Sequence, residues 1–297
     1  MTQTITDLAE VAPRYRALFC DLWGCVHDGI AAFPAAVAAL QAYRAGGGRV
    51  ILVTNAPRPK TGVVGQLARL GVPADAWDDI ATSGDAAQAA MVMGAVGRAV
   101  HHIGPAKDAS FFTDFADDVA SLAATAPPVA RVALEEASGI VCTGPFDELT
   151  DTPEDYRGTF LRAKAMGLKL LCANPDLVVD LGDRRIYCAG ALAQLYDGMG
   201  GTSLYFGKPH PPIYDLARRR LAALDPGLTD ADILCVGDNI ATDIQGGLAE
   251  GLDTLFVAAG LSASAFGPDP SHPDPDLLTA WLSAQTTRPT LAIGRLR

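Results

Sequence analysis

Short apolar runs alternate along the chain with longer segments whose apolar positions recur at helical spacing. The runs ALFCD (17–21) and RVILVTN (49–55) predict strands, and the second is rich in β-branched residues. The segments 35–47 and 60–71 carry helical patterns that end in glycine, a common helix stop. This strand and helix order predicts an α/β fold with a parallel sheet and helices on both of its faces.

The same alternation continues to the end of the chain. Further helices are predicted at 81–96, 152–167 and 212–224, and further strands at 98–104, 139–144, 168–174, 184–190 and in the runs LYFG, ADILCVGD and TLFVAAG. The stretch 262–276 is proline-rich and has no periodicity, so we expect a surface loop there.

Polar residues stand at or just after the ends of four apolar runs that lie far apart in the chain. They are Asp21 in LFCDLWGCVHDG, Thr54 in ILVTNAPR, Lys208 in YFGKPH and Asp238 in LCVGDNIATDIQGG. The carboxyl ends of parallel strands share one edge of a sheet, where open α/β sheets bind ligands. The sequence therefore predicts that these four residues belong to one site.

The interval between the second and third of these segments is too long for a loop and too rich in predicted elements to be disordered. We therefore expect an inserted domain. The predicted organisation is a discontinuous core domain over 1–84 and 191–297 and an inserted α/β domain over 85–190.

The four residues have the chemistry that phosphoryl transfer requires, which is positioning together with charge stabilisation. A carboxylate such as Asp21 can attack phosphorus and form an aspartyl-phosphate. Carboxylates from two strand ends, with Asp238 and Asp243 following the later run, can share a magnesium ion. Thr54 offers a hydroxyl, and Lys208 is a compact positive charge suited to a phosphate.

Composition narrows the choice of partners and compartment. The net charge of −11 and the absence of a basic patch argue against nucleic acid, and no apolar run is long enough to span a membrane. The N-terminus does not have the pattern of a signal peptide. Six cysteines without CxxC spacing indicate buried free thiols, so we expect a cytoplasmic protein.

Taken together, the four segments resemble the haloacid dehalogenase (HAD) superfamily, subfamily IIA, which includes nucleotide, sugar-phosphate and 4-nitrophenyl phosphatases. DLWGCVHDG, VTN, GKP and GDNxxTD resemble its four motifs in order. CANPD (172–176), followed by CAGALAQLY (188–196), resembles the region where the cap of this subfamily returns to the core. The resemblance implies a Rossmann-like parallel-sheet core, a large inserted α/β cap and one Mg²⁺.

Residue roles follow from the resemblance, position by position. It implies that Asp21 is the nucleophile and a metal ligand, joined as ligands by the backbone carbonyl of Trp23 and by Asp238. Asp243 and Asn239 would lie next to these ligands and hold them in place without binding the metal themselves. Three further residues, Thr54, Asn55 and Lys208, would hold the phosphorylated substrate.

The chain departs from the family pattern at Trp23. Phosphatases of this family carry a second aspartate there, which protonates the leaving group and then activates water. Loss of a general acid/base costs roughly 10²–10⁴-fold in rate. His27 and Asp28 either replace this function or are surface turn residues, and the Trp23 ring is either a platform for a substrate ring or a plug.

Three residues are candidates for binding the rest of the substrate. Arg58, after the second segment, either faces an anionic group or is a solvated charge at a helix start. Asn174 and Asp176 either position substrate, as the equivalent loop does in relatives, or form a turn in the Asn-Pro-Asp sequence.

The leading hypothesis is a Mg²⁺-dependent hydrolase that acts on a small phosphorylated metabolite, with a sugar phosphate as one candidate. The alternative is a protein that binds a phosphorylated ligand without efficient turnover because of Trp23. Phosphonate cleavage would need a Schiff-base lysine from the inserted domain, where only Lys107, Lys164 and Lys169 lie. Caps of this size often join dimer contacts in relatives, so a homodimer is one alternative for the assembly.

Overall fold

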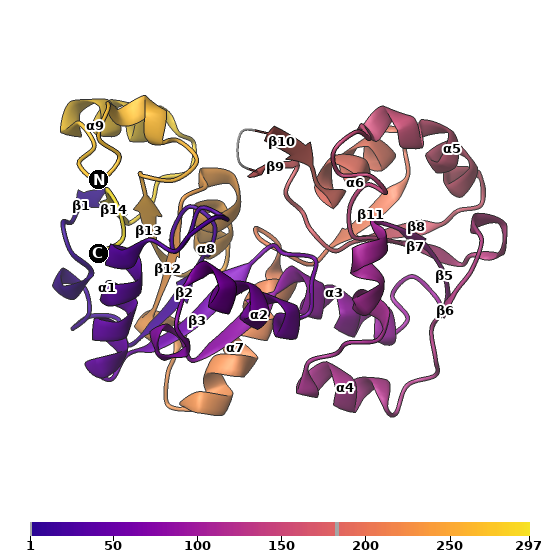
Figure 1. The fold of residues 1–297 in the computed structure, drawn as a ribbon, viewed down its shortest axis with the longest axis horizontal. Coiled ribbons are helices and arrows are strands. Elements are labelled where there is room, and N and C mark those ends of the chain that lie inside the picture. The colour runs from indigo at the N-terminus through magenta and orange to yellow at the C-terminus, as the bar shows by residue number, and fades with distance from the viewer. Residues whose placement is uncertain (1, 182–183) are drawn as a thin grey trace. The chain divides into compact units, whose positions relative to one another are not determined.

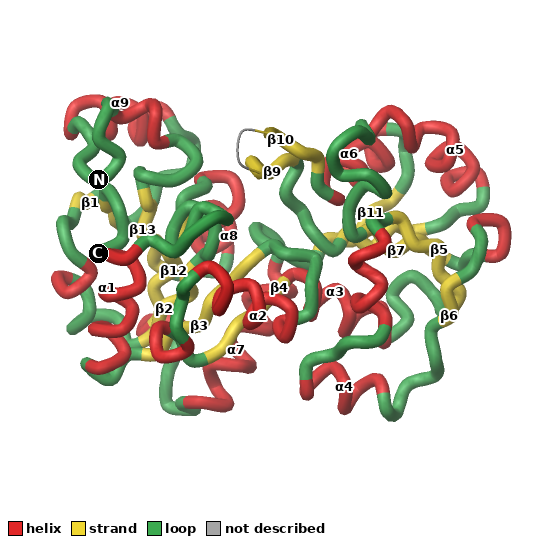
Figure 2. Tube along the Cα trace, in the orientation of Figure 1, coloured by secondary structure: helices red, strands yellow, loops and turns green. Residues whose placement is uncertain are grey.

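The computed structural model describes residues 2–181 and 184–297. Figures 1 and 2 show the course of the chain and its secondary structure. The strands are β1 (Gln3–Thr4), β2 (Ala17–Cys20), β3 (Arg49–Thr54), β4 (Asp79–Thr82), β5 (Ala99–Ile103), β6 (Ala130–Arg131), β7 (Gly139–Cys142), β8 (Lys169–Cys172), β9 (Val178–Leu181), β10 (Arg184–Tyr187), β11 (Thr202–Tyr205), β12 (Ile233–Gly237), β13 (Asp253–Val257) and β14 (Leu291–Ile293).

Helices lie between most of these strands. The α-helices are α1 (Pro34–Ala45), α2 (Lys60–Leu70), α3 (Ser83–Val92), α4 (Asp117–Ala123), α5 (Arg157–Ala165), α6 (Ala189–Gly198), α7 (Pro211–Leu224), α8 (Gln245–Ala249) and α9 (Pro275–Ala284). Short helical turns are η1 (Leu8–Glu10), η2 (Ala74–Ala76), η3 (Ala106–Phe112), η4 (Leu134–Glu136), η5 (Pro153–Tyr156), η6 (Asp230–Asp232), η7 (Ile240–Ile244) and η8 (Ala263–Phe266).

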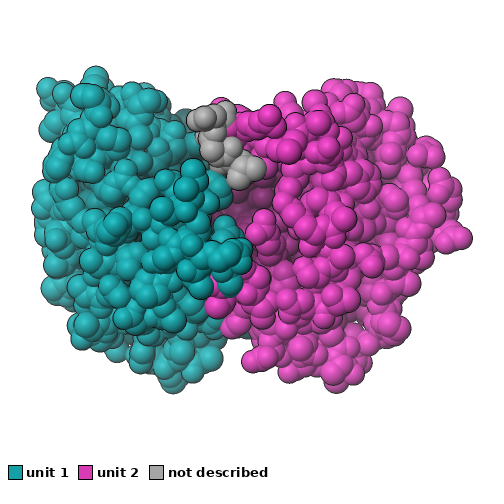
Figure 3. Space-filling view, viewed as in Figure 1, with its two compact units in different colours: residues 1–54, 65–81, 214–297 teal, residues 55–64, 82–213 magenta. Residues whose placement is uncertain are grey.

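The chain divides into two compact units, which Figure 3 colours separately. Unit 1 contains 1–54, 65–81 and 214–297, and unit 2 contains 55–64 and 82–213. The sequence predicted the edges of the inserted domain at 85 and 190. The later edge of unit 2 lies at 213 because β11 pairs in parallel with β8 and extends the sheet of that unit.

Unit 1 is built on a seven-stranded sheet in the order β1-β14-β13-β12-β2-β3-β4. The strand pairs from β1 to β3 in this order are all parallel. The central strands β2 and β12 are buried along their whole length. Such continuous apolar runs are typical of parallel strands that are covered on both faces. The predicted Rossmann-like α/β architecture is therefore confirmed for this unit.

Unit 2 contains a second parallel sheet, with the order β11-β8-β7-β5-β6, and a separate antiparallel hairpin of β9 and β10. Alternate residues of one strand face opposite layers of helices, as the period of two in a strand requires. In β7, Ile140 packs into a cluster with Phe160 of α5 and Leu192 of α6. Its neighbour Val141 packs into a cluster with Met91 of α3 and Val119 of α4.

Two predictions of secondary structure are wrong in part. The strand predicted over 184–190 ends at Tyr187, because the next apolar side chains recur at helical spacing and are buried in α6. The predicted surface loop 262–276 contains η8 and the start of α9. Phe266 anchors this stretch, since its ring packs edge-on against Phe256 and Trp281.

No helix in the described parts of the chain combines the length and apolar character needed to cross a bilayer.

A half-buried histidine in unit 2 makes stability depend on pH. His102 bonds Thr143 through Nε2 at 3.0 Å, and burial lowers the pKa of its imidazole to about 4, below the usual value near 6.5. The unfolded chain binds this proton below about pH 6.5 and the folded chain does not. The stabilising contribution is therefore present above pH 6.5 and is lost as the pH falls toward 4.

We accordingly expect the free energy of unfolding to fall between pH 6.5 and 4, and to fall less steeply in His102→Gln. Urea unfolding of both proteins at several pH values measures the slopes. Identical slopes would contradict the assignment of this pH dependence to His102.

Candidate active site

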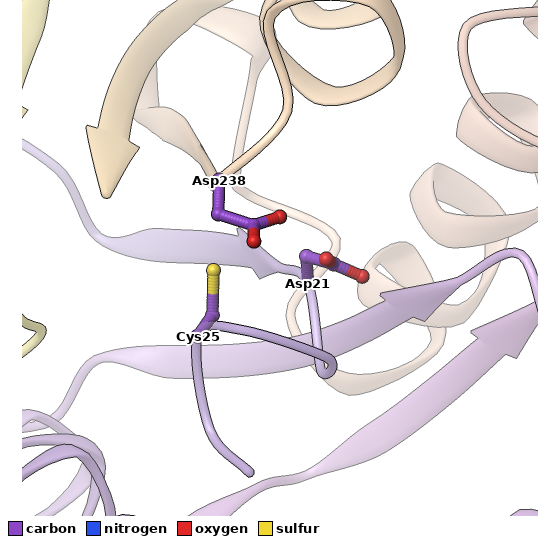
Figure 4. Close-up of side chains that lie close together, drawn as sticks. All are labelled: Asp21, Cys25 and Asp238. Carbon is purple, nitrogen blue, oxygen red and sulfur yellow. The ribbon is translucent and has the colours of Figure 1, made fainter. Parts of the chain in front are cut away.

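Two buried carboxylates and a thiol converge at one edge of the unit 1 sheet (Figure 4). Asp21 follows β2, Asp238 follows β12, and Cys25 lies in the loop after Asp21. Their potential ligand atoms all lie within 4.8 Å of one another, and all three residues are buried. Since β2 and β12 are parallel neighbours, their carboxyl ends bring the first and fourth sequence segments together as predicted.

The loop after β2 turns sharply around its glycines. The Asp21 amide donates to the Val236 carbonyl of β12 at 2.8 Å, which extends the pairing of the two strands by one residue. Gly24 then adopts a φ of +78°, in the left-handed region that favours glycine, and its amide donates to the His27 carbonyl at 2.9 Å. This compact turn keeps the residues after Asp21 at the edge of the sheet.

The position of the Asp238 carboxylate depends on two glycines and one amide. The Leu261 amide donates to Asp238 Oδ2 at 2.7 Å. A Cβ atom added at either Gly24 or Gly260 would overlap this same oxygen. The Asp238 side chain therefore reaches its place only because neither backbone carries a side chain there.

Gly260→Ala is expected to weaken Mg²⁺ binding about 10- to 100-fold, because the new methyl group displaces the Asp238 carboxylate. Titration calorimetry with Mg²⁺ measures the effect. Gly65→Ala is the matched control, since Gly65 lies in α2 and its added Cβ would meet only the Arg69 side chain at 3.6 Å. Equal Mg²⁺ affinity in both variants would contradict this role of Gly260.

Asp243 lies in the π-helical turn η7, and Asn239, which follows Asp238, is the residue just before that turn. The Asn239 amide donates to Asp243 Oδ2 at 3.1 Å, and Asn239 Oδ1 accepts from the Ala241 amide at 2.9 Å. Both side chains thus hold the backbone of the turn. π-Turns are rare and often occur at functional sites, and this one shapes the segment behind a predicted metal ligand.

The donor chemistry of this cluster fits a hard cation. Carboxylate oxygens are the ligands that Mg²⁺ prefers, and two carboxylates this close together repel each other unless a positive charge lies between them. Burial, and then the charges of Asp238 and Asp21, raise the pKa of the Cys25 thiol well above its usual range. The raised pKa favours the neutral thiol, so the carboxylate oxygens are the hard donors of this cluster.

The sequence did not single out Cys25 as part of the site. Its only signal was its place four residues after Asp21 within the first segment. That spacing does not reveal which way the side chain points, so the cysteine was interpreted only as a buried thiol.

Trp23 is half-buried, and its ring lies over the backbone of its own loop. It meets the His27 ring edge-on, with centroids 5.6 Å apart, and a Cβ added at Gly29 would overlap its outer ring atoms. Gly29 has a φ of +88°. The indole is thus enclosed by its own loop on at least two sides.

The two candidate replacements for the missing acid differ in the structure. The interpretation of His27 as a surface turn residue is wrong, because its side chain is buried, its Nδ1 accepts from the Gly29 amide at 3.1 Å, and burial lowers its pKa. Asp28 is exposed and accepts from the Ile30 and Ala31 amides at 2.8 Å each, so it is a turn former.

Unit 2 brings together a second group of predicted site residues. The Asn55 side chain bonds both the backbone of Lys208 and the carboxylate of Asp176. All these side chains except Asp176 are buried, and Asp176 is half-buried. Asn174 Oδ1 accepts from the Asp176 amide at 3.0 Å, the pattern of an Asx turn, so the Asn174 side chain shapes this loop.

Two further predicted site residues are Thr54 and Arg58. Thr54 is the last residue of β3 and is buried in unit 1. Arg58 is half-buried in unit 2, where its carbonyl accepts from the Thr82 hydroxyl at 2.8 Å. Burial raises the pKa of the Asp108 carboxyl, and the positive charge of Arg58 is one of the smaller effects that lower it. The role of each toward a substrate stays a prediction.

Comparison with known proteins decides the family. Residues 18–116 match the family model described as haloacid dehalogenase-like hydrolase, and residues 205–280 match the HAD-hydrolase-like model. A solved hydrolase of the haloacid dehalogenase-like family from Brucella suis 1330 is 38% identical, covers 99% of this chain and 100% of its own, and superposes with a TM-score of 0.83. The chain belongs to the haloacid dehalogenase-like family.

Two further relatives indicate the chemistry found in this family. The 5'-nucleotidase YutF of Bacillus subtilis (strain 168) is 31% identical over 39% of this chain and 45% of its own length. The glycerol phosphate phosphatase Rv1692 of Mycobacterium tuberculosis, solved in complex with magnesium, is 25% identical over 97% of this chain and 77% of its own, with a TM-score of 0.69. The match to YutF covers less than half the length of that protein.

Proposed function

We propose that the protein is a Mg²⁺-dependent phosphatase that hydrolyses a small phosphorylated metabolite through an aspartyl-phosphate at Asp21. The observation that carries the proposal is the convergence of the Asp21 and Asp238 carboxylates at the carboxyl ends of adjacent parallel strands. Phosphatase names among the relatives support it, including the nucleotidase and the glycerol phosphate phosphatase.

In this proposal Asp21, Asp238 and the Trp23 carbonyl would hold Mg²⁺. When bound, the ion would offset the negative charge shared by the carboxylates and the substrate phosphate. Asp243 and Asn239 keep the segment after Asp238 in place. Thr54, through its hydroxyl, and Lys208, through its ammonium, would bind phosphate oxygens.

The proposed reaction has two displacements at phosphorus. First, a carboxylate oxygen of Asp21 forms a bond to phosphorus while the ester P–O bond breaks, and the alcohol leaves with a proton taken from water. Water then attacks the phosphorus of the aspartyl-phosphate, which releases inorganic phosphate and restores the Asp21 carboxylate. Trp23 carries no acidic group, so this chain lacks the usual proton donor, and substrates with acidic leaving groups are favoured.

The proposed substrate is defined by its chemical class, a small phosphorylated metabolite. Arg58, Asn174 and Asp176 are proposed to contact the part of the metabolite beyond the phosphate, and a sugar phosphate is the first candidate. We further propose a cytoplasmic protein, which six buried cysteines outside disulfides support, and we propose no nucleic-acid or membrane partner. A homodimer is the proposed assembly.

One observation favours a second candidate, which is binding of a phosphorylated ligand without efficient turnover. The Trp23 ring occupies its loop position by packing on Gly29 and His27, and it supplies no proton at the place where phosphatases of this family do. Such a protein would keep the metal and the phosphate ligands but discharge the aspartyl-phosphate slowly.

A rapid-quench experiment with 4-nitrophenyl phosphate distinguishes the two candidates. For a phosphatase we expect Mg²⁺-dependent release of inorganic phosphate in steady state, together with a phosphorylated peptide that contains Asp21 by mass spectrometry. A phosphorylated peptide that accumulates without steady release would favour the second candidate. If phosphate release and the phosphorylated peptide are both absent, the proposed reaction is overturned.

A further inference from the structure

The side chain of Asn55 connects three chain segments within unit 2. Asn55 Oδ1 accepts from the Lys208 amide at 2.7 Å, and Asn55 Nδ2 donates to the Lys208 carbonyl at 3.0 Å. The same Nδ2 donates to Asp176 Oδ1 at 2.9 Å. These bonds join residues 153 and 121 positions apart in the chain.

The bonding capacity of this amide is almost fully used by these contacts. A carboxamide has two N–H donors and one carbonyl oxygen, and here both donors and the oxygen have partners. Asn55 is also buried. Its side chain therefore acts on the protein itself, and a direct bond from its N–H groups to a substrate would have to break one of these contacts.

The pair of bonds to Lys208 holds both peptide groups of that residue. One bond takes the N–H and the other takes the C=O of the same residue, so the backbone of Lys208 cannot rotate without losing at least one. The direction of the Cα–Cβ bond follows from the backbone. Asn55 thus determines where the Lys208 side chain starts.

Close packing beside Lys208 restricts the same segment. A Cβ added at Gly207 would lie 2.5 Å from Asn55 Oδ1, 2.6 Å from Pro175 Cδ and 2.7 Å from Ser83 Oγ. Protein interiors at this density adjust little to a change at one residue. Atoms of three other segments, Asn55 among them, therefore lie close to Gly207 and leave no room for a side chain there.

From this geometry we propose that Asn55 is a positioning residue that acts on phosphate through Lys208, and that it couples Lys208 to the turn at Asp176. The proposal rests on the proposed function, in which Lys208 binds the phosphate, and it replaces a direct substrate contact by Asn55. A displacement of the order of 1 Å in a group that positions substrate can cost about 10²-fold in rate.

Asn55→Ala is expected to lower kcat for 4-nitrophenyl phosphate about 10²-fold and to change KM less. The decisive measurement is a double-mutant cycle with Lys208→Ala. If Asn55 acts only through the lysine, Asn55→Ala does not lower kcat any further in a protein that lacks the lysine side chain. Losses that multiply in the double variant would overturn the proposal. If the activity of Lys208→Ala is too low to measure, the exchange experiment on the Lys208 amide decides the proposal.

Gln88→Ala is the matched control for a merely structural effect. Gln88 is another buried amide of unit 2, and its Nε2 donates to the carbonyls of Phe111 and Asp114 at 2.8 Å each. Its removal should lower the melting temperature about as much as Asn55→Ala while leaving kcat within about twofold. An equal loss of kcat in both variants would overturn a specific role for Asn55.

Hydrogen–deuterium exchange tests the contact without relying on turnover. The Lys208 amide should exchange faster in Asn55→Ala than in wild type and at the wild-type rate in Gln88→Ala. Unchanged exchange in Asn55→Ala overturns the proposed positioning, whatever the activity. If the wild-type protein shows neither turnover nor affinity for inorganic phosphate, the proposed function and the catalytic part of this inference are overturned. The exchange result still decides whether Asn55 holds Lys208.

Discussion

Asp21→Asn is expected to lower kcat for 4-nitrophenyl phosphate by at least about 10⁴-fold, because the amide cannot form the aspartyl-phosphate. The amide also removes one of two negative charges that lie within 4.8 Å of each other. Without metal, the variant should therefore melt at the same temperature as wild type or higher. Steady-state kinetics with Mg²⁺ and thermal melting without it measure the two effects.

The control for Asp21→Asn is Asp253→Asn, which removes a carboxylate of the same unit at the start of β13. Asp253 bonds Arg14, Tyr15 and Thr290, and it belongs to none of the proposed site groups. Its kcat should remain within about twofold of wild type, while its melting temperature falls. Retention of full activity in Asp21→Asn would contradict the proposed nucleophile directly.

Trp23→Asp is expected to raise the rate of hydrolysis of an alkyl phosphate such as glycerol phosphate by about 10²–10⁴-fold. The new carboxyl would supply the proton donor and base that the chain lacks. The gain should be much smaller with 4-nitrophenyl phosphate, whose leaving group hardly needs protonation. Comparison of kcat/KM for the two substrates in wild type and variant measures the difference.

The control for Trp23→Asp is Trp23→Asn, which removes the same ring. The asparagine side chain is nearly the same size as that of aspartate but has no carboxyl proton to donate. Both variants lose the edge-on contact of Trp23 with His27, worth about 0.5–1.5 kcal/mol beyond buried area, so both should melt at lower temperature. An equal change in alkyl phosphate hydrolysis in the two variants would show that removal of the ring, and not the carboxyl, is responsible.

The strands that carry the site could be predicted from the sequence because their signal is local. The apolar run before Asp21 became β2, and the run before Asp238 became β12, each buried along its length. A parallel sheet then requires polar residues at the carboxyl ends of adjacent strands to share an edge. The convergence of Asp21 and Asp238 followed from these two facts.

Side-chain direction within loops could not be predicted in this way. Cys25 and His27 lie in one loop, and their sequence positions do not distinguish a residue that points at Asp238 from one that points to solvent. The structure places the Cys25 thiol beside the carboxylates and buries His27 against Trp23. Both outcomes depend on the turn at Gly24, whose positive φ redirects the chain.

The sequence by itself determined the α/β class and the strands that precede the polar residues, because each rests on a periodicity of a few residues. The common edge of a parallel sheet then predicted that Asp21 and Asp238 converge. Only the tertiary structure decided that Asn55 binds Lys208 and Asp176, across 153 and 121 positions, and that β11 belongs to unit 2. Such contacts join segments whose local patterns are independent of one another, so no local periodicity encodes them.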